Sequence, residues 1–98
     1  MEGRLLVEAR VEAERLLLAL DAALAADADL LVAAERAELD ADMARLRAAL
    51  GGTDRDAVNA AAQALEARSK IFAERRMDRG IRSALSGLSL DQLESKVG

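Results

Sequence analysis

No proline interrupts the 98 residues, and apolar residues recur at intervals of three and four over most of the chain. Because proline breaks helix interiors, its absence leaves long continuous helices open to this sequence. Ala and Leu, both strong helix formers, supply most of the 52% of residues that are hydrophobic, and β-branched and aromatic residues are scarce. We therefore predict an all-α fold, with a long amino-terminal helix joined to a small antiparallel bundle of three to four helices.

The residues that the chain lacks limit its chemistry. It contains no His and no Cys, so the usual proton-transfer group, a thiolate nucleophile and a zinc–thiolate site are all missing. The net charge of −4 argues against nucleic acid as a partner. The longest apolar run, LLLAL, is too short for a membrane span, which needs ~20 residues, and the amino end does not resemble a signal peptide. We expect a non-catalytic domain with no metal, cofactor, nucleic acid or membrane of its own.

The first helix, expected from about residue 2 to 28, carries two apolar stripes rather than one. They are rotated by roughly 130° from each other at ~100° per residue. The first comprises Leu6, Ala9, Ala13, Leu17, Leu20 and Leu24, and the second comprises Val7, Val11, Leu18, Ala22 and Ala25. A surface helix of a small bundle needs only one such stripe. Two stripes indicate a helix buried on two sides against different neighbours.

The lengths of the first two helices differ, and the difference predicts an overhang. The second helix is expected over 33–50, with a seam at Leu39, Met43, Leu46 and Leu50. At 1.5 Å per residue the first helix is about 40 Å long and the second about 27 Å. An antiparallel second helix therefore leaves Leu5, Leu6 and Val7 uncovered. An uncovered apolar patch usually marks a partner site, and self-association of the isolated chain through these residues is one hypothesis.

Turn residues punctuate the second half of the chain. Gly51 is expected to end the second helix in the left-handed conformation, and Thr53 with Asp56 resembles a capping box that opens the third. The buried face of the third helix is predicted to comprise Val58, Ala61, Ala62, Leu65 and Phe72.

Beyond Phe72 the apolar stripe of the third helix turns by about a third of a turn, to Met77, Ile81, Ala84 and Leu85. This shift favours a bend or break between Glu74 and Gly80, or docking on a different neighbour. Ser89 with Gln92 predicts a short tail helix.

Four arginines, Arg75, Arg76, Arg79 and Arg82, lie within the sixteen residues FAERRMDRGIRSALSG. The first interpretation is structural: Asp78 is spaced to pair with Arg75 and with Arg82, and Arg76 is placed to reach Asp40 or Asp42 across the bundle. The others are a protein-partner surface, an anion or nucleic-acid site, and catalysis. No glycine-rich loop or aromatic platform accompanies the arginines, so we favour structural roles.

Two further groups are interpreted without a special function. Asp40 and Asp42 point about 160° apart on a helix and lack calcium-loop spacing, so both are expected on a solvated face. Met43 and Met77 are expected to fill the core.

The segment that holds the arginines also resembles a known family. Phe72-Ala73, Arg75 to Asp78, and Arg82-x-Ala84-Leu85-x-Gly87 followed by Ser89-Leu90-Asp91 resemble the carboxyl end of the HscA branch of the 70-kDa heat-shock chaperone family. This branch serves iron–sulfur cluster assembly. The strings EARVEAERLL, ALAADA and LLVAAER extend the resemblance over nearly the whole chain.

The resemblance implies that residues 1–98 form the helical lid of a chaperone substrate-binding domain. About 1–28 would be the long lid helix, lying over a β-sandwich that holds an extended hydrophobic peptide, and about 29–98 the helical bundle. It further implies ATP hydrolysis in a nucleotide-binding domain elsewhere in the full-length protein, an iron–sulfur scaffold protein as client, a J-domain co-chaperone, and a bacterial cytoplasmic location.

The resemblance also bears on single residues of the lid helix. Glu14 stands at an acidic position that latches the lid to the sandwich in the generic branch, and Leu18 stands where that branch has a polar latch residue. The implied lid or partner-facing surface comprises Leu5, Leu6, Val7, Val11, Glu14 and Leu18. The alternative is an autonomous helical adaptor or coiled-coil dimerisation module.

Overall fold

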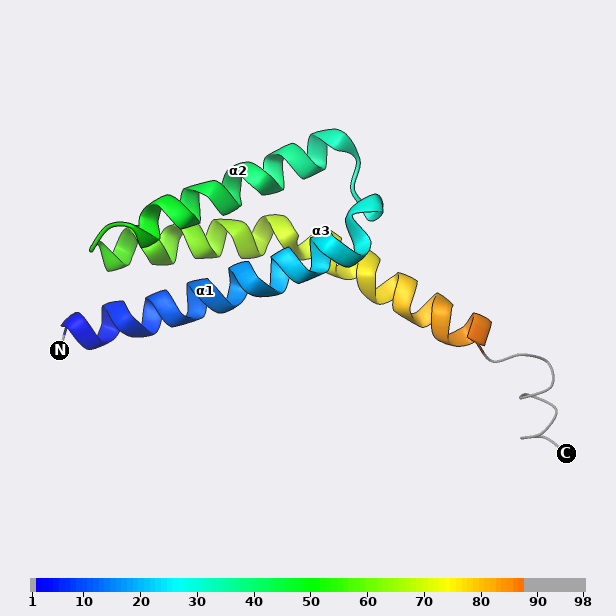
Figure 1. Cartoon of the computed structure of the whole chain (residues 1–98), viewed down its shortest axis with the longest axis horizontal. Helices are drawn as coiled ribbons and strands as arrows, with labels where there is room; N and C mark the ends of the chain where they lie inside the picture. Colours follow the sequence, from blue (N-terminus) through cyan, green and yellow to red (C-terminus); the bar gives the residue numbers. More distant parts are fainter. Residues whose placement is uncertain (1, 88–98) are drawn as a thin grey trace, which may run out of the picture.

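The computed structural model describes residues 2–87 and comprises three α-helices joined by short connections. Helix α1 spans Glu2–Asp27, a short 3-10 turn η1 spans Ala28–Leu30, α2 spans Ala33–Leu50, and α3 spans Arg55–Gly87. Figure 1 shows α2 returning antiparallel to α1, and α3 running back beside both. The predicted all-α fold is confirmed, and the predicted range of the second helix is the observed one. The expected tail helix at Ser89 lies outside the described residues.

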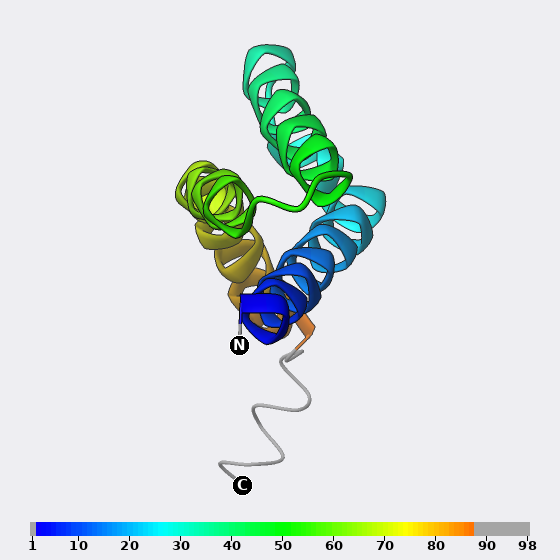
Figure 2. The ribbon, with the colours of Figure 1, turned by 90° about the vertical axis from the view of Figure 1, so that its left-hand side faces the viewer.

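The core is built from one face of each helix. In the end-on view of Figure 2 the three helices are arranged around a common centre, roughly at the corners of a triangle. The buried apolar side chains are Ala13, Leu17, Leu20, Ala23, Leu24, Leu39, Met43, Leu46, Val58, Leu65 and Phe72. They include most of the first stripe of α1, three of the four residues of the α2 seam, and Val58, Leu65 and Phe72 of the predicted face of α3. Leu50, Ala61 and Ala62 are only partly buried and pack against this core. The spacing of apolar residues therefore identified most of the core.

The helix ends differ from the prediction. Gly51 is right-handed, with φ −75° and ψ −14°, and its N–H donates to the Ala48 carbonyl at 3.1 Å. The expected left-handed end is therefore wrong, because the chain leaves α2 through a tight right-handed turn. The expected cap at Thr53 is also wrong: Asp54 Oδ1 accepts the N–H groups of Asp56 at 3.0 Å and Ala57 at 3.3 Å.

Helix α3 does not break between Glu74 and Gly80, since it is helical throughout Arg55–Gly87. Figure 1 shows it changing direction and continuing beyond the corner where α1 ends and α2 begins. Among residues 2–87, neither α1 nor α2 covers the part of α3 beyond the corner, where residues 80–86 are exposed. Met77 lies there with 68% of its surface exposed. Its predicted core position is therefore wrong, whereas Met43 is buried as expected.

Candidate docking surface

The candidate site is the side of α1 that faces away from the bundle. We define the outer stripe as Val7, Val11 and Leu18 together with the exposed Ala22 and Ala25. Val7 is 59% exposed, Val11 40% and Leu18 70%, whereas Leu17 and Leu24 on the inner side are buried. The bundle therefore covers one of the two apolar stripes of α1 and leaves the other in water.

The amino end of α1 reaches beyond the turn between α2 and α3. The Arg10 guanidinium donates to the Gly52 carbonyl in that turn, and Arg47 near the end of α2 pairs with Asp21 at 3.0 Å. These contacts fix the antiparallel register of α1 and α2. Ahead of them Leu5 and Val7 are exposed, as the helix lengths predicted. Leu6 is half-buried instead of uncovered, because it belongs to the inner stripe.

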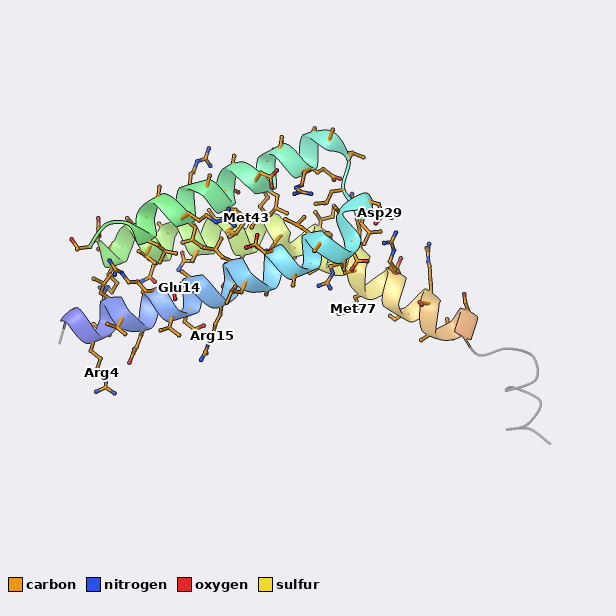
Figure 3. All side chains as sticks on the ribbon, viewed as in Figure 1. Arg4, Glu14, Arg15, Asp29, Met43 and Met77 are labelled. Atoms are coloured by element: carbon orange, nitrogen blue, oxygen red, sulfur yellow. The ribbon has the colours of Figure 1, made fainter. Side chains whose placement is uncertain are left out.

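Charged residues border the outer stripe. Arg4 pairs with Glu8 at 3.4 Å, and Arg15 pairs with Glu12 at 3.7 Å. Figure 3 shows Arg4 and Arg15 pointing away from the other helices. Glu14 is also exposed on the same helix. An apolar strip with a charged margin has the composition of a protein–protein interface, in which an apolar centre is surrounded by a polar rim.

Three of the clustered arginines of α3, Arg75, Arg76 and Arg79, lie around the corner between α1 and α2. Arg75 forms a two-pronged pair with Glu35, at 2.6 and 2.9 Å, and also donates to the Leu30 carbonyl at 2.8 Å. Arg79 donates to Asp27 at 3.1 Å and to Asp29 at 2.9 Å. We call Arg75, Arg76 and Arg79 with these partners the corner clamp, because the contacts join α3 to α1, η1 and α2.

Two of the predicted arginine contacts are wrong and one is confirmed. Arg76 pairs with Asp27 at 2.9 Å instead of Asp40 or Asp42, and its guanidinium carbon lies 5.9 Å from the centre of the Phe72 ring. Arg75 reaches Glu35 rather than Asp78. Arg75 and Arg76 pair with other partners because Asp27, Glu35 and the Leu30 carbonyl lie within their reach at this corner. Arg82, beyond the corner, pairs with Asp78 at 3.4 Å as predicted.

The corner clamp changes the acidity of its members. Hydrogen bonds from Arg76 and Arg79 lower the pKa of Asp27, and that of Arg79 lowers the pKa of Asp29. The hydrogen bond from Arg75 and the Val32 N–H, at 3.0 Å, lower the pKa of Glu35. The Glu35 carboxylate thereby accepts the N–H of Val32 at the start of α2. Val32 itself has no polar side chain that could cap this helix. All three carboxylates stay charged at neutral pH, so each arginine of the corner clamp is already engaged in an ion pair within the chain.

Asp42 corrects the expectation of a solvated acid. It is only 3% exposed, and its carboxylate accepts from Arg45 at 2.7 Å and from Arg68 of α3 at 2.5 Å. Arg68 also donates to Glu38 at 2.6 Å. Asp42 directly precedes Met43 and lies four residues before Leu46, so its position beside the α2 seam was the available signal of burial. Asp40 is exposed, as expected, and pairs with Arg36 at 3.0 Å.

Within residues 2–87, no three His, Cys, Asp or Glu side chains are grouped so that they could hold a metal ion. None of the helices that the structure describes is long and apolar enough to cross a membrane. The feature that the described residues present is an exposed apolar stripe on α1, which the corner clamp links to α3 through Asp27.

No family model matches the chain. Individual relatives do match. It is 54% identical over 93 residues to the Chaperone protein HscA homolog of Burkholderia multivorans, 53% identical to that of Variovorax paradoxus, and 52% identical to that of Burkholderia mallei. Each match covers 95% of the chain but only 15% of the relative, and it falls on a carboxyl-terminal segment.

Proposed function

Starting from the homology of this chain to a carboxyl-terminal segment of the HscA chaperones, we propose that it is the lid of a substrate-binding domain. About 1–28 would be the lid helix and about 29–98 the helical bundle that holds it. The lid closes over a hydrophobic peptide and slows its release, and it is itself non-catalytic. The observation that carries the proposal is the outer stripe, which is apolar and exposed although the inner stripe of the same helix is buried from Ala13 to Leu24.

In this proposal the lid works by a shift between a docked and an open position. The outer stripe contacts the β-sandwich and the peptide, with Val7, Val11 and Leu18 as the apolar centre and Glu14 as a polar contact at the edge. Full burial of one Val or Leu contributes about 1.5–3 kcal/mol. A few such side chains supply the differential affinity that a two-position equilibrium needs, and that equilibrium can be biased from a distant domain.

The other partners that we propose rest only on the sequence similarity to the HscA chaperones. In the full-length protein an ATP-hydrolysing domain would bias the lid, a J-domain co-chaperone would stimulate that domain, and a scaffold protein of iron–sulfur cluster assembly would be the client. The cytoplasm of a bacterium is the proposed location. The arginines of the corner clamp are proposed to keep the bundle rigid, so that the lid helix moves as one body with it.

The rival proposal is an adaptor in which the outer stripe pairs with a second copy. Val11, Leu18 and Ala25 recur every seven residues, as in one position of a coiled-coil heptad. The second apolar position of such a heptad would fall on Glu14 and Asp21. Two copies would bring these acids together along the seam, and like charges in a seam are unfavourable. The acids are compatible with a lid edge, so we favour the lid.

The rate of peptide release tests the proposal. In the full-length chaperone with ADP bound, Leu18→Glu should speed dissociation of a fluorescent hydrophobic peptide at least about tenfold, because it removes about 1.4 kcal/mol or more of docking free energy. Ala19→Glu is the matched control, since it adds the same charge at the neighbouring exposed position outside the stripe. Equal release rates for the two variants would overturn the lid role of the outer stripe.

A further inference from the structure

The outer stripe of α1 has no charged side chain at its centre. Val7, Val11 and Leu18 are its bulky members, and the smaller Ala22 and Ala25 continue it toward the carboxyl end of the helix. The charged residues of α1 lie at the margins of the stripe. Whether they can contribute to docking depends on the contacts that they already make within the chain.

The charges on one margin of the stripe are paired within α1. Arg4 pairs with Glu8 at 3.4 Å, and Arg15 pairs with Glu12 at 3.7 Å. All four side chains are mostly exposed, and exposed pairs are weak, so exchanging one of them for a pair with a partner gains little. Each pair is also neutral as a unit, so this margin has little net charge with which to attract a docking surface.

The charges on the other margin contact the rest of the bundle. Arg10 donates to the Gly52 carbonyl, and its Nε is buried. Asp21 pairs with Arg47 of α2 at 3.0 Å. Among the acids of α1 whose side chains the structure describes, Glu14 alone has no ion pair, although Arg10 stands four residues ahead of it. Glu14 is therefore the only described acid of α1 that a docking partner could pair with at no cost to an existing contact.

We propose that apolar burial, and not charge pairing, holds the docked lid, so that the receiving surface of the β-sandwich is apolar where it meets Val7, Val11 and Leu18. This inference rests on the proposed lid function and adds the chemistry of the contact. Val7 to Leu18 span about 17 Å of helix, which is the length of apolar strip that the receiving surface must provide. Salt screens exposed charge pairs but does not weaken apolar contacts. Closure of the lid should therefore be insensitive to ionic strength.

The salt dependence of peptide release tests the inference in the full-length chaperone with ADP bound. The probe is a fluorescent hydrophobic peptide without charged side chains. Leu18→Glu, in which the proposed lid is open, reports how salt affects the peptide site itself. From about 0.05 to 0.5 M KCl, the wild-type release rate divided by that of Leu18→Glu should change by less than about twofold. A larger increase in this ratio would show that charge pairs hold the lid, and would overturn the inference.

Two substitutions of similar size test the chemistry of the receiving surface directly. Met and Gln side chains are both unbranched and of nearly equal length, but only Met is apolar. Leu18→Gln should release the peptide about tenfold faster than Leu18→Met, because a polar amide loses its contacts with water when it is buried against an apolar surface. A Leu18→Gln variant that holds the peptide as long as Leu18→Met does would contradict an apolar contact.

Failure of this inference can be distinguished from failure of the lid proposal. The lid role fails if Leu18→Glu and Ala19→Glu release the peptide at equal rates. The apolar contact fails alone if Leu18→Glu is the faster of these two while Leu18→Gln holds the peptide as long as Leu18→Met does.

Discussion

Arg75 and Arg79 each make three hydrogen bonds to other elements, and Arg75 is the one that reaches α2. Its guanidinium holds both oxygens of Glu35 on α2 and the carbonyl of Leu30 in η1. A planar guanidinium suits this task because its donors match a carboxylate and a neighbouring carbonyl at once. Arg82, only seven residues away, has an exposed pair with Asp78 of its own helix. Three of the four arginines therefore join α3 to other elements, whereas Arg82 pairs only with an acid of its own helix.

We predict that Arg75→Gln lowers the midpoint temperature of unfolding clearly more than Arg82→Gln does. The first change leaves Glu35 without its strongest partner and frees the Leu30 carbonyl, whereas the second removes a solvent-exposed pair of little worth. Thermal unfolding followed by circular dichroism is the measurement, and Arg82→Gln is the matched control. Equal decreases in the two variants would mean that the corner clamp adds nothing to stability.

The lowered pKa values of Asp27, Asp29 and Glu35 predict a loss of stability in acid. In the unfolded chain these groups return to ordinary values of 3.8 for the aspartates and 4.5 for the glutamate. The unfolded state then binds more protons, so stability rises with pH across this window. The midpoint temperature should be steady from neutral pH to about pH 5 and fall below about pH 4. In the variant Arg79→Gln the midpoint temperature should fall less steeply in acid, because Asp27 and Asp29 lose a hydrogen bond that lowers their pKa values. An equally steep fall in this variant would contradict the assignment of the acid sensitivity to these pairs.

The partners of the arginines that join helices could not be predicted from the sequence. Spacing along one helix predicted Asp78 for Arg82 correctly but also for Arg75, which pairs with Glu35 on α2. Arg76 was expected to reach an acid of α2 across the bundle, and its partner is Asp27 at the end of α1. A long arginine side chain can reach several acids, and the packing of the helices decides which of them lies near. Because this packing depends on residues far away in sequence, local spacing does not predict the partner. Asp42 is a different case, since its place beside the α2 seam was visible and was outweighed by its charge.

The helices themselves were largely predictable. The range of α2 was predicted to the residue, and the two-sided apolar pattern of α1 corresponds to one buried and one exposed stripe. Local patterns suffice here because Ala and Leu at helical spacing leave few alternatives. The backbone conformation after α2 and the residue that caps α3 were less predictable, since Gly51, Thr53 and Asp54 all suit a turn and the observed cap depends on the path between the helices.

Substitutions on the two sides of the helices should differ strongly in effect. Leu65→Ala in α3 removes a fully buried side chain and should lower the free energy of unfolding by about 2–5 kcal/mol. Leu18→Ala on the outer stripe removes the same atoms from a side chain that is 70% exposed. This variant should change the free energy of unfolding by no more than about 0.5 kcal/mol. Urea denaturation of both variants provides the comparison. A loss for Leu18→Ala as large as that for Leu65→Ala would mean that the outer stripe is buried in the isolated chain.

The molecule is elongated, with dimensions of 61 × 33 × 18 Å and a radius of gyration of 18.3 Å. A compact domain of similar length has a radius of gyration of about 13 Å. The bundle surrounds only the inner side of α1, and α3 projects past the corner clamp (Figure 1). Such a shape exposes apolar side chains on both helices, Val7, Val11 and Leu18 on α1 and Met77, Ile81 and Leu85 on α3. We propose that those on α1 dock on another domain of a longer chain.

Photo-cross-linking from the outer stripe tests the central claim, which is that the exposed side of α1 docks on another domain of the same protein. A photoreactive residue is placed at Leu18 in the full-length chaperone with peptide and ADP bound, and in a matched variant at Ala19. The account predicts that position 18 is linked within the same chain to the β-rich peptide-binding domain, and position 19 much less. Links from position 18 only between copies, or no intrachain link at all, would contradict it.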